Sequence, residues 1–162
     1  MSGMTENTAI ADYWNAYVEE HPKVKDKYDS AWAFGDSPRL ANELLELVLQ
    51  GIKTGTASNK VLFEKQGLSL PFIGGHSILL DGDGVPRAII ETTHIETVPF
   101  NEVTAEFAYS EGEDDRSLGS WRHEHEVYFT REFNRYGMPF DPTMKVVCEN
   151  FRVVHVKPMT IT

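Results

Sequence analysis

The sequence has 162 residues, 41% hydrophobic and 25% charged, a composition typical of a globular protein of one domain. Its formal net charge of −10 argues against binding of duplex DNA through the overall field, because phosphate binding requires clustered Lys and Arg. There is no signal-peptide pattern and no apolar run near the roughly 18 residues that span a membrane, so we expect a cytoplasmic protein without membrane association.

The charge is distributed unevenly along the chain. Residues 51–100 carry 4 basic and 5 acidic side chains, whereas residues 1–50 carry 4 and 9, and residues 101–162 carry 7 and 11. An anionic or polar ligand would therefore be repelled least by the middle third. This distribution favours a nucleoside-sized ligand or a short single strand over duplex DNA.

The N-terminal part of the chain predicts two helices separated by a short apolar segment. From Thr8 onward, apolar residues recur at spacings of three and four, and Pro22 ends this first helix. Residues 31–34 form a short apolar run that indicates a brief strand or a packing segment. A second helix begins after Ser37, a residue type that caps helix N-termini, and ends before Gly51.

A lysine follows the end of this second helix. Lys53 is succeeded by Thr54, Thr56 and Ser58, which alternate with small residues as in a short strand. A lysine held on such a turn is a candidate for chemistry. The alternative interpretation is a helix cap followed by a solvated lysine.

The middle of the chain predicts a short helix and then a β-hairpin. Residues 59–66 indicate a helix, with Ser58 as its expected N-cap. Residues 76–80 and the β-branched stretch 87–98 indicate two strands, and the Asp-Gly-Asp-Gly sequence at 81–84 supplies the turn between them.

The C-terminal part predicts two further helices and a strand. One helix is expected to begin after Pro99, and the acidic residues 111–115 then indicate a solvated loop. Ser117 is the expected cap of a long helix that Gly137 ends, and residues 145–156 return to a strand. The whole order predicts an α+β domain with a mixed or antiparallel sheet, open or closed into a barrel, and helices packed around it.

Several familiar site types are absent from the sequence. It contains no Walker loop, dinucleotide fingerprint or Gly-x-Ser-x-Gly elbow. His123 and His125 are two residues apart on a predicted helix, about 200° around it, so they cannot share a metal as i, i+4 pairs do. We expect Cys148 to be a buried, inert thiol and Trp121 to belong to the core.

The lysine could act in two opposed ways. Partial burial would lower the pKa of Lys53 and make it a base or a nucleophile. In the protonated form it would instead stabilise an oxyanion or a phosphate, and a neighbouring carboxylate would favour that form. The sequence leaves both roles open.

The order of motifs resembles a known family. Gly51-Ile52-Lys53-Thr54-Gly55-Thr56 is followed by the motifs at 78–84, 90–93, 98–100, 105–108, 111–113 and 121–122. From about Trp32 to Val156 this order resembles the ASCH domain family. The resemblance implies a PUA-like β-barrel surrounded by helices, with mixed, mainly antiparallel strands and a cleft that contains the motif lysine. With this range, we expect an N-terminal helical extension at 1–30 packed on the domain, an ASCH domain at 31–157 and a tail at 158–162.

The resemblance also implies site residues. The motif lysine corresponds to Lys53, the motif threonine to Thr56, and the catalytic glutamate to Glu111, with Glu113 as the alternative. The expected binding residues are Thr54, Ser58, Glu113 and Arg122, and no metal ligand is assigned.

Three functions are compatible with these residues, and the family's link to RNA suggests each. As an N4-acetylcytidine amidohydrolase, the protein would use Thr56, Lys53 or water as nucleophile and Glu111 to shuttle protons. As a ribonuclease on single-stranded RNA, it would place Lys53 on the scissile phosphate, with Glu111 or His94 as base and a divalent metal on the acidic segment. The third function is non-catalytic binding of RNA or a nucleotide.

We expect a hydrolase that acts on RNA or a modified nucleoside. Its partner would be single-stranded RNA or a small nucleoside ligand, not a membrane or duplex DNA. No cofactor is assigned beyond the divalent metal of the ribonuclease mechanism. The sequence does not decide between a monomer and a homodimer.

Overall fold

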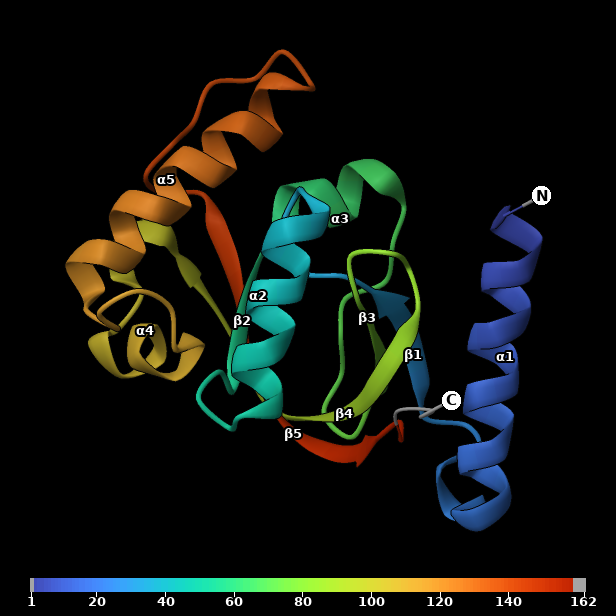
Figure 1. Ribbon diagram of the computed structural model, residues 1–162. Coiled ribbons are helices and arrows are strands. Elements are labelled where there is room, and N and C mark those ends of the chain that lie inside the picture. Colours follow the sequence, from blue (N-terminus) through green and yellow to red (C-terminus); the bar gives the residue numbers. More distant parts are fainter. Residues whose placement is uncertain (1, 159–162) are drawn as a thin grey trace. The chain divides into compact units, whose positions relative to one another are not determined.

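A computed structural model describes residues 2–158 (Figure 1), and it describes side chains from Thr8 onward. Within the described part, the chain forms two compact units. The first contains residues 2–51, 72–93 and 151–158, and the second contains residues 52–71 and 94–150. The predicted division into an extension, a domain and a tail stays a prediction, and residues 159–162 of that tail lie outside the described residues.

Five strands form one mixed sheet in the order β1-β3-β4-β5-β2. Strand β1 is parallel to β3, whereas β3 with β4 and β2 with β5 are antiparallel. The strands are β1 (Tyr28–Trp32), β2 (Gly55–Asn59), β3 (His76–Leu80), β4 (Pro86–Pro99) and β5 (Lys145–Val156). The mixed, mainly antiparallel character predicted from the sequence is thus confirmed.

The expected closed barrel is not confirmed. In the described part of the chain, β1 and β2 stand at the two ends of the strand order, so the sheet is open. Closure would require hydrogen bonds between these two strands, which are only five residues long each. Short edge strands are the usual alternative to closure, because they leave few backbone groups unpaired.

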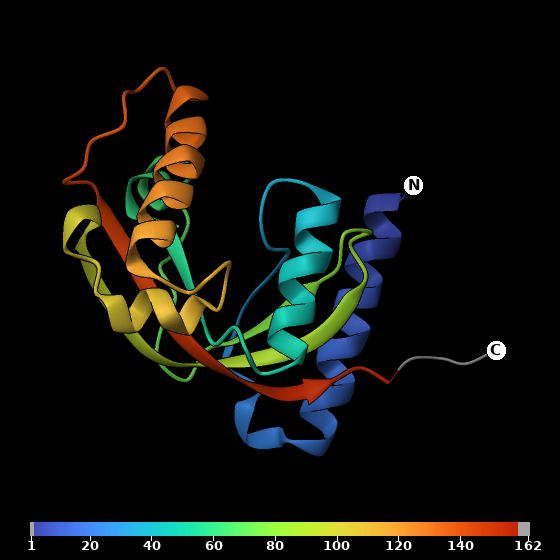
Figure 2. The same cartoon turned by 60° about the vertical axis from the view of Figure 1, so that its left-hand side comes forward.

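In the first unit, two helices cover opposite faces of the sheet (Figure 2). Ile78 and Ile89 are cross-strand partners and pack against Tyr13 and Tyr17 of α1 (Ser2–Glu20). The neighbouring positions on both strands point to the other face and pack against α2 (Pro38–Leu49). This alternation follows from the two-residue period of a strand.

The second unit has its own core, which three helices help to form. They are α3 (Lys60–Gln66), α4 (Ala105–Glu111) and α5 (Leu118–Asn134). Apolar side chains of α4 and α5 pack with Phe100 and Met144 on Val146 and Cys148 of β5. The α4 and α5 helices therefore have fixed positions relative to β2 and to Lys53, which lies in the loop just before this strand.

The predicted caps of two helices and the predicted hairpin turn are confirmed. Ser37 Oγ accepts from Leu40 N–H at 3.2 Å at the start of α2, and Ser117 Oγ accepts from Ser120 N–H at 3.1 Å at the start of α5. In the hairpin turn, Asp81 Oδ1 accepts from the N–H groups two and four residues later, at 2.9 and 3.0 Å.

Several boundaries differ from the prediction, and three of them have a clear local cause. The cap of α3 is Asn59 and not Ser58, because Ser58 is still paired in β2 while Asn59 Oδ1 accepts from Val61 N–H at 3.1 Å. The helix expected after Pro99 is a short 3-10 turn, Phe100–Glu102, after which Thr104 caps a separate helix, α4. Helix α5 ends at Asn134, three residues before Gly137.

Among the described residues, none of the helices combines the length and apolar character needed to cross a lipid bilayer.

The hairpin turn gives a first testable prediction. A Cβ added at Gly82 would stand 2.4 Å from the backbone oxygen of Pro38, so Gly82→Ala must displace backbone atoms. We expect this change to lower the free energy of unfolding by roughly 1–3 kcal/mol, measured by urea denaturation. As a control, Gly119→Ala meets no atom within 4 Å and should stabilise by up to about 1 kcal/mol. Equal stability of the two variants would contradict the close approach.

Candidate functional site

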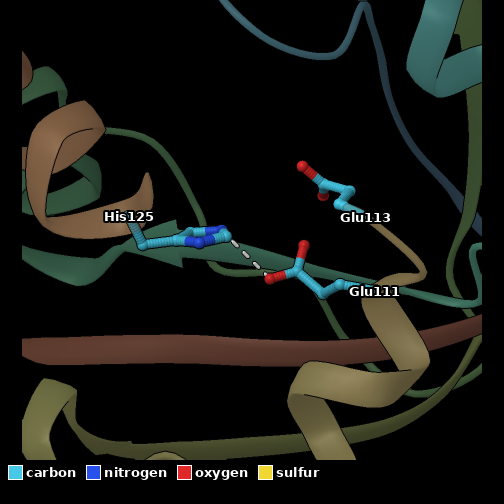
Figure 3. Close-up of side chains that lie close together, drawn as sticks. All are labelled: Glu111, Glu113 and His125. Atoms are coloured by element: carbon cyan, nitrogen blue, oxygen red, sulfur yellow. Dashed lines mark ion pairs between the residues drawn. The ribbon is translucent and has the colours of Figure 1, made fainter. Parts of the chain in front are cut away.

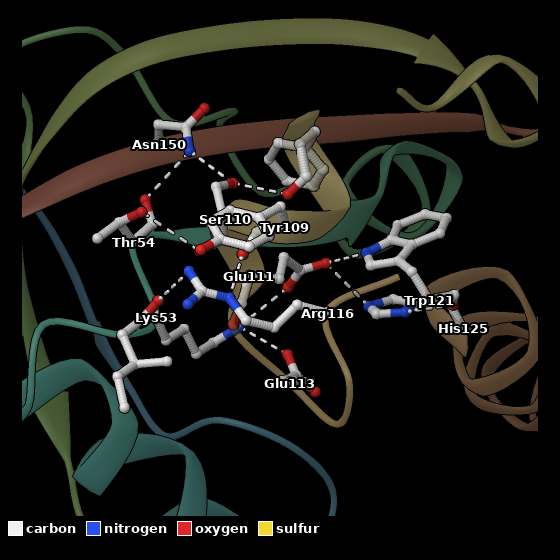
Figure 4. Close-up of polar contacts among 12 residues, drawn as sticks. Lys53, Thr54, Tyr109, Ser110, Glu111, Glu113, Arg116, Trp121, His125 and Asn150 are labelled. Carbon is white, nitrogen blue, oxygen red and sulfur yellow. Dashed lines mark hydrogen bonds and ion pairs between the residues drawn. The ribbon is translucent and has the colours of Figure 1, made fainter. Parts of the chain in front are cut away.

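The segment that carries Lys53 is tied to two other elements of the second unit. Thr54 N–H donates to Ser110 O in α4 at 2.7 Å, and Asn150 Nδ2 in β5 donates to Thr54 O at 3.1 Å. Asn150 Nδ2 also donates to Ser110 Oγ at 3.0 Å (Figure 4). These bonds fix the backbone on the C-terminal side of Lys53.

The end of α4 approaches the same segment closely. Gly112 is buried with φ of +71°, and a Cβ there would stand 2.5 Å from Ile52 O. Only glycine satisfies both the left-handed conformation and this contact. Gly112 therefore allows its two neighbours, Glu111 and Glu113, to lie next to Lys53.

Lys53 lies between these two glutamates. Its Nζ donates to Glu111 Oε1 at 2.9 Å, to Glu113 Oε2 at 2.7 Å and to the backbone oxygen of Glu111 at 3.3 Å (Figure 4). An ammonium group has three N–H donors, so these acceptors match its capacity. The side chains of Lys53 and Glu111 are 1% and 2% exposed, whereas that of Glu113 is 32% exposed.

The second oxygen of Glu111 meets helix α5. His125 Nε2 lies 3.1 Å from Glu111 Oε2 (Figure 3), and Trp121 Nε1 donates to the same oxygen (Figure 4). The other ring nitrogen, His125 Nδ1, lies 2.9 Å from Trp121 O. Both ring nitrogens thus face acceptors, and only a doubly protonated imidazolium can donate to both.

The electrostatic surroundings agree with this protonation pattern. Burial alone would lower the pKa of Lys53, but the carboxylates of Glu111 and Glu113 outweigh burial and raise it. Burial would raise the pKa of Glu111, and the charges of Lys53 and His125 instead hold it well below its usual range. Burial would lower the pKa of His125, yet Glu111 raises it. The cluster therefore holds two cations and two carboxylates, and its charges balance.

Chemically, this arrangement excludes the unprotonated lysine at rest. A protonated Lys53 is neither a base nor a nucleophile, but it can donate to an oxyanion. Glu111 has both oxygens engaged and is closed to solvent, so it holds Lys53 and His125 in place. Glu113 is the partly exposed carboxylate and the better placed of the two to exchange protons with a ligand or water.

Sequence reasoning missed Arg116, which holds the backbone on both sides of the cluster. Its Nη2 donates to Ile52 O at 3.3 Å and its Nε donates to Tyr109 O at 3.0 Å. Its guanidinium carbon lies 3.6 Å from the centre of the Tyr109 ring. Arg116 thus links the residue before Lys53 to the helix that ends in Glu111. No motif marked it, because its partners are backbone carbonyls.

Trp121 and His125 were also missed as site residues. Trp121 does pack in the core, as expected, but its indole N–H bonds to Glu111. The sequence related His125 only to His123, as a pair that cannot share a metal, whereas its partner is Glu111, fourteen residues earlier. The helical spacing of four between Trp121 and His125 was the available signal, since it places both rings on one face.

The other predicted site residues do not join the cluster. Thr54 Oγ1 donates to Ser110 O at 3.3 Å, and Arg122 is exposed and donates to Asn101 O at 3.2 Å. Thr56 pairs with Glu149 across β2 and β5, and among the contacts described for residues 8–158 none joins its side chain to Lys53 or Glu111. Ser58 lines a separate pocket.

The acidic segment was expected to be a solvated loop and a candidate metal site. Glu111 instead ends α4 and is buried. One ligand atom each of Glu111, Glu113 and His125 lies within 4.8 Å of the others (Figure 3). However, the Lys53 ammonium already takes one oxygen from each glutamate, and a divalent ion would have to displace this buried cation. The donor set therefore does not fit a metal ion.

Cys148 behaves as predicted. It is buried in β5, and burial, together with Glu111 and Glu96, raises the pKa of its thiol to about 12. A thiol with such a pKa stays protonated near neutral pH, so Cys148 is not a nucleophile.

Comparison with known proteins gives the following matches. A family model described as the ASCH domain matches residues 30–155. The crystal structure of an ASCH domain from Lactobacillus crispatus JV V101 is 31% identical, with a TM-score of 0.81 over 93% of this chain and 94% of that chain. A protein from Enterococcus faecalis V583 is 35% identical, with a TM-score of 0.84 over 92% of this chain and 90% of that chain. No curated protein matches the sequence significantly.

The buried pair predicts a large loss of stability in Glu111→Gln. This change keeps the shape of the side chain but leaves the Lys53 and His125 charges without their shared carboxylate. We expect the free energy of unfolding to fall by about 3–5 kcal/mol in urea denaturation. The matched control Glu106→Gln, on the exposed side of α4, should change it by less than about 0.5 kcal/mol. Similar losses in both variants would show that the pair does not stabilise the fold.

The raised pKa of His125 predicts a pH-dependent contribution to stability. A raised folded pKa means that the stabilisation is fully present below the usual histidine pKa of about 6.5 and is lost as the pH rises through the folded pKa. The stability difference between the native protein and His125→Gln should therefore be larger at about pH 6 than at about pH 9. The exposed His123→Gln variant serves as the control. A His125→Gln difference that grows with pH would refute the assigned charge state.

Proposed function

The chain belongs to the ASCH domain family, a PUA-like fold associated with RNA-related function, and on that basis we propose that it hydrolyses the amide bond of an N-acylated nucleoside of the N4-acetylcytidine type. The observation that carries the proposal is the Lys53 ammonium held between the Glu111 and Glu113 carboxylates. It offers a cation for a developing oxyanion beside a partly exposed carboxylate that can exchange protons.

The charge balance of the cluster favours a neutral substrate. Two carboxylates already neutralise Lys53 and His125, so the cluster has no excess positive charge for a phosphodiester. A scissile phosphate would instead meet Glu113 as a like charge. An acyl amide is uncharged in its ground state, and negative charge develops on its oxygen only in the transition state, where Lys53 can stabilise it.

Access to Lys53 requires a movement of Glu113. Lys53 is almost completely buried, and Glu113 is the exposed one of its two carboxylate partners. In the proposed mechanism, the Glu113 side chain turns away and the acyl oxygen takes its place on Lys53 Nζ. Glu111 and its bonds to Trp121 and His125 stay in place and hold the lysine.

The proposed reaction then proceeds by addition and elimination. Water attacks the acyl carbon, one of its protons passes to Glu113, and the oxyanion accepts hydrogen bonds from the Lys53 ammonium. The bond between the acyl carbon and the nucleoside nitrogen breaks, and Glu113 returns the proton to that nitrogen. The products are a carboxylic acid and the free amino nucleoside. Lys53 remains protonated throughout.

This assignment changes the roles predicted from the sequence. Glu113 replaces Glu111 as the proton carrier, because both oxygens of Glu111 are already bound. Water is the nucleophile, because Thr56 makes none of the described contacts with the cluster. Thr56 stays a predicted site residue, and the activity of Thr56→Val will decide whether it takes part.

A second candidate is a non-catalytic module that binds RNA or a nucleotide. The burial of Lys53 and the full set of partners around Glu111 favour it, since both are also typical of a structural ion pair. Under this alternative, the protein binds nucleosides or single-stranded RNA but does not turn them over.

The proposal predicts that purified protein releases cytidine and acetate from N4-acetylcytidine, measured by liquid chromatography. Glu113→Gln should lower turnover at least about a hundredfold, because the proton carrier is lost. It should nevertheless fold, because Lys53 keeps Glu111 as a partner. Glu106→Gln, the same change at an exposed position on α4, should leave turnover unchanged.

Parallel measurements separate the alternatives. Since the cation of the site is Lys53, EDTA should leave turnover unchanged. Absence of cytidine release, or native turnover in Glu113→Gln, would contradict the proposal. Cleavage of single-stranded RNA would support the ribonuclease function, and binding without turnover of either substrate would support the non-catalytic module.

A further inference from the structure

A second site lies in the same unit, separate from the Lys53 cluster. A pocket of about 190 Å³ is formed by the end of β2, helix α3, Leu68 and helix α5. Its lining residues are Ala57, Ser58, Asn59, Leu62, Phe63, Gln66, Leu68, Tyr128 and Glu132. None of them belongs to the Lys53 cluster, and the predicted binding residue Ser58 is among them.

Asn59, one of the lining residues, carries an unsatisfied hydrogen-bond donor. Its Oδ1 caps α3 by accepting from Val61 N–H at 3.1 Å, which also identifies the other terminal atom as the amide nitrogen. The residue is 3% exposed, and Nδ2 has no hydrogen-bond partner among the described residues. A buried donor without a partner costs about 1–3 kcal/mol.

The capping role does not explain this donor. Serine and aspartate cap helix N-termini about as well as asparagine, and neither carries an amide N–H. An asparagine at this position therefore adds a donor that the fold does not use. A ligand with an acceptor atom would satisfy it.

The other lining groups limit the class of ligand. Glu132 would repel an anion, and no lysine or arginine lines the pocket, so a phosphate or a carboxylate does not fit. The N–H groups of the Asn59 amide carry partial positive charge and would repel a metal ion or an ammonium group. What remains is a neutral ligand with an acceptor for Asn59 and an N–H group for Glu132.

The walls and the size favour a flat ring. Phe63 and Tyr128 are aromatic, and Leu62 and Leu68 are apolar. The volume lies below the roughly 300 Å³ at which pockets for drug-sized ligands begin, so a single ring system fits, with any attached groups outside. Asn59 Nδ2 is closed to solvent, so a ligand reaches it only when the pocket opens, and the exposed side chains of Gln66 and Leu68 can move without disturbing the core.

We propose that this pocket binds a nucleobase. Every common nucleobase is a neutral planar ring that carries an acceptor next to an N–H group, and proteins bind unstacked bases by aromatic contacts and bonds to these edges. Asn59 Nδ2 donates to the acceptor and Glu132 accepts from the N–H group. The inference does not depend on the proposed hydrolysis, because it concerns binding of an unmodified base.

The test is a titration of the protein with cytidine, uridine, adenosine and guanosine, followed by two-dimensional ¹H–¹⁵N NMR. At least one nucleoside should shift the Asn59 side-chain amide signal together with backbone signals of residues 57–66. Asn59→Ser keeps an oxygen for the cap and removes the donor, so it should weaken binding about five- to tenfold. Asn134→Ser, the same change at an exposed position at the end of α5, should bind as the native protein does.

Two results would overturn the proposal. One is the absence of any shift of the Asn59 amide signal at about 10 mM of each nucleoside. The other is native affinity in Asn59→Ser. If Asn59→Ser does not fold, the proposal is judged by whether nucleosides shift the Asn59 side-chain amide signal of the native protein. Since no acylated substrate is present, the outcome is independent of hydrolysis at Lys53.

Discussion

The Lys53 ammonium is closed to solvent, and a charge removed from water is costly unless partners surround it. The polar residues around it meet this requirement. Two carboxylates and a backbone oxygen accept hydrogen bonds from it, and His125 supplies a second positive charge to the buried carboxylate, which Trp121 also fixes by a hydrogen bond. The network joins two segments, the loop before β2 and the end of α4. The close approach of Gly112 to Ile52 and the hydrogen bond from Arg116 to Ile52 O hold these two segments together.

The same network limits what the site can do. Because both carboxylates raise the pKa of Lys53, the residue serves as a cation and not as a base. Glu111 is held by three side chains, whereas Glu113 is partly exposed and follows a glycine. Any chemistry at this site therefore depends on how readily Glu113 exchanges Lys53 for a ligand. If Glu113 does not move, no ligand can reach Lys53, and the cluster is then a structural ion pair in a protein that binds without catalysis.

Most helices and strands could be predicted from capping residues, turn residues and apolar spacing. These signals involve residues only a few positions apart, so they can be recognised in the sequence alone. Errors arose where strand pairing decided the boundary, as at Asn59, where β2 extends through the expected cap Ser58. The site was predicted in part. Family motifs identified Lys53, Glu111 and Glu113, but His125 and Arg116 contact the site through folding of distant segments. The unpaired amide of Asn59 could not be predicted, because it depends on burial in three dimensions.

Lys53 stays protonated while it is buried between two carboxylates, and every role described for the cluster depends on this charge. NMR titration of the Lys53 side-chain carbon next to Nζ measures this directly in the native protein. We expect that its signal does not titrate until the pH exceeds the usual lysine pKa of about 10.4. A transition near neutral pH would contradict it, because Lys53 would then be a base and the ion pair with Glu111 would not be the resting state.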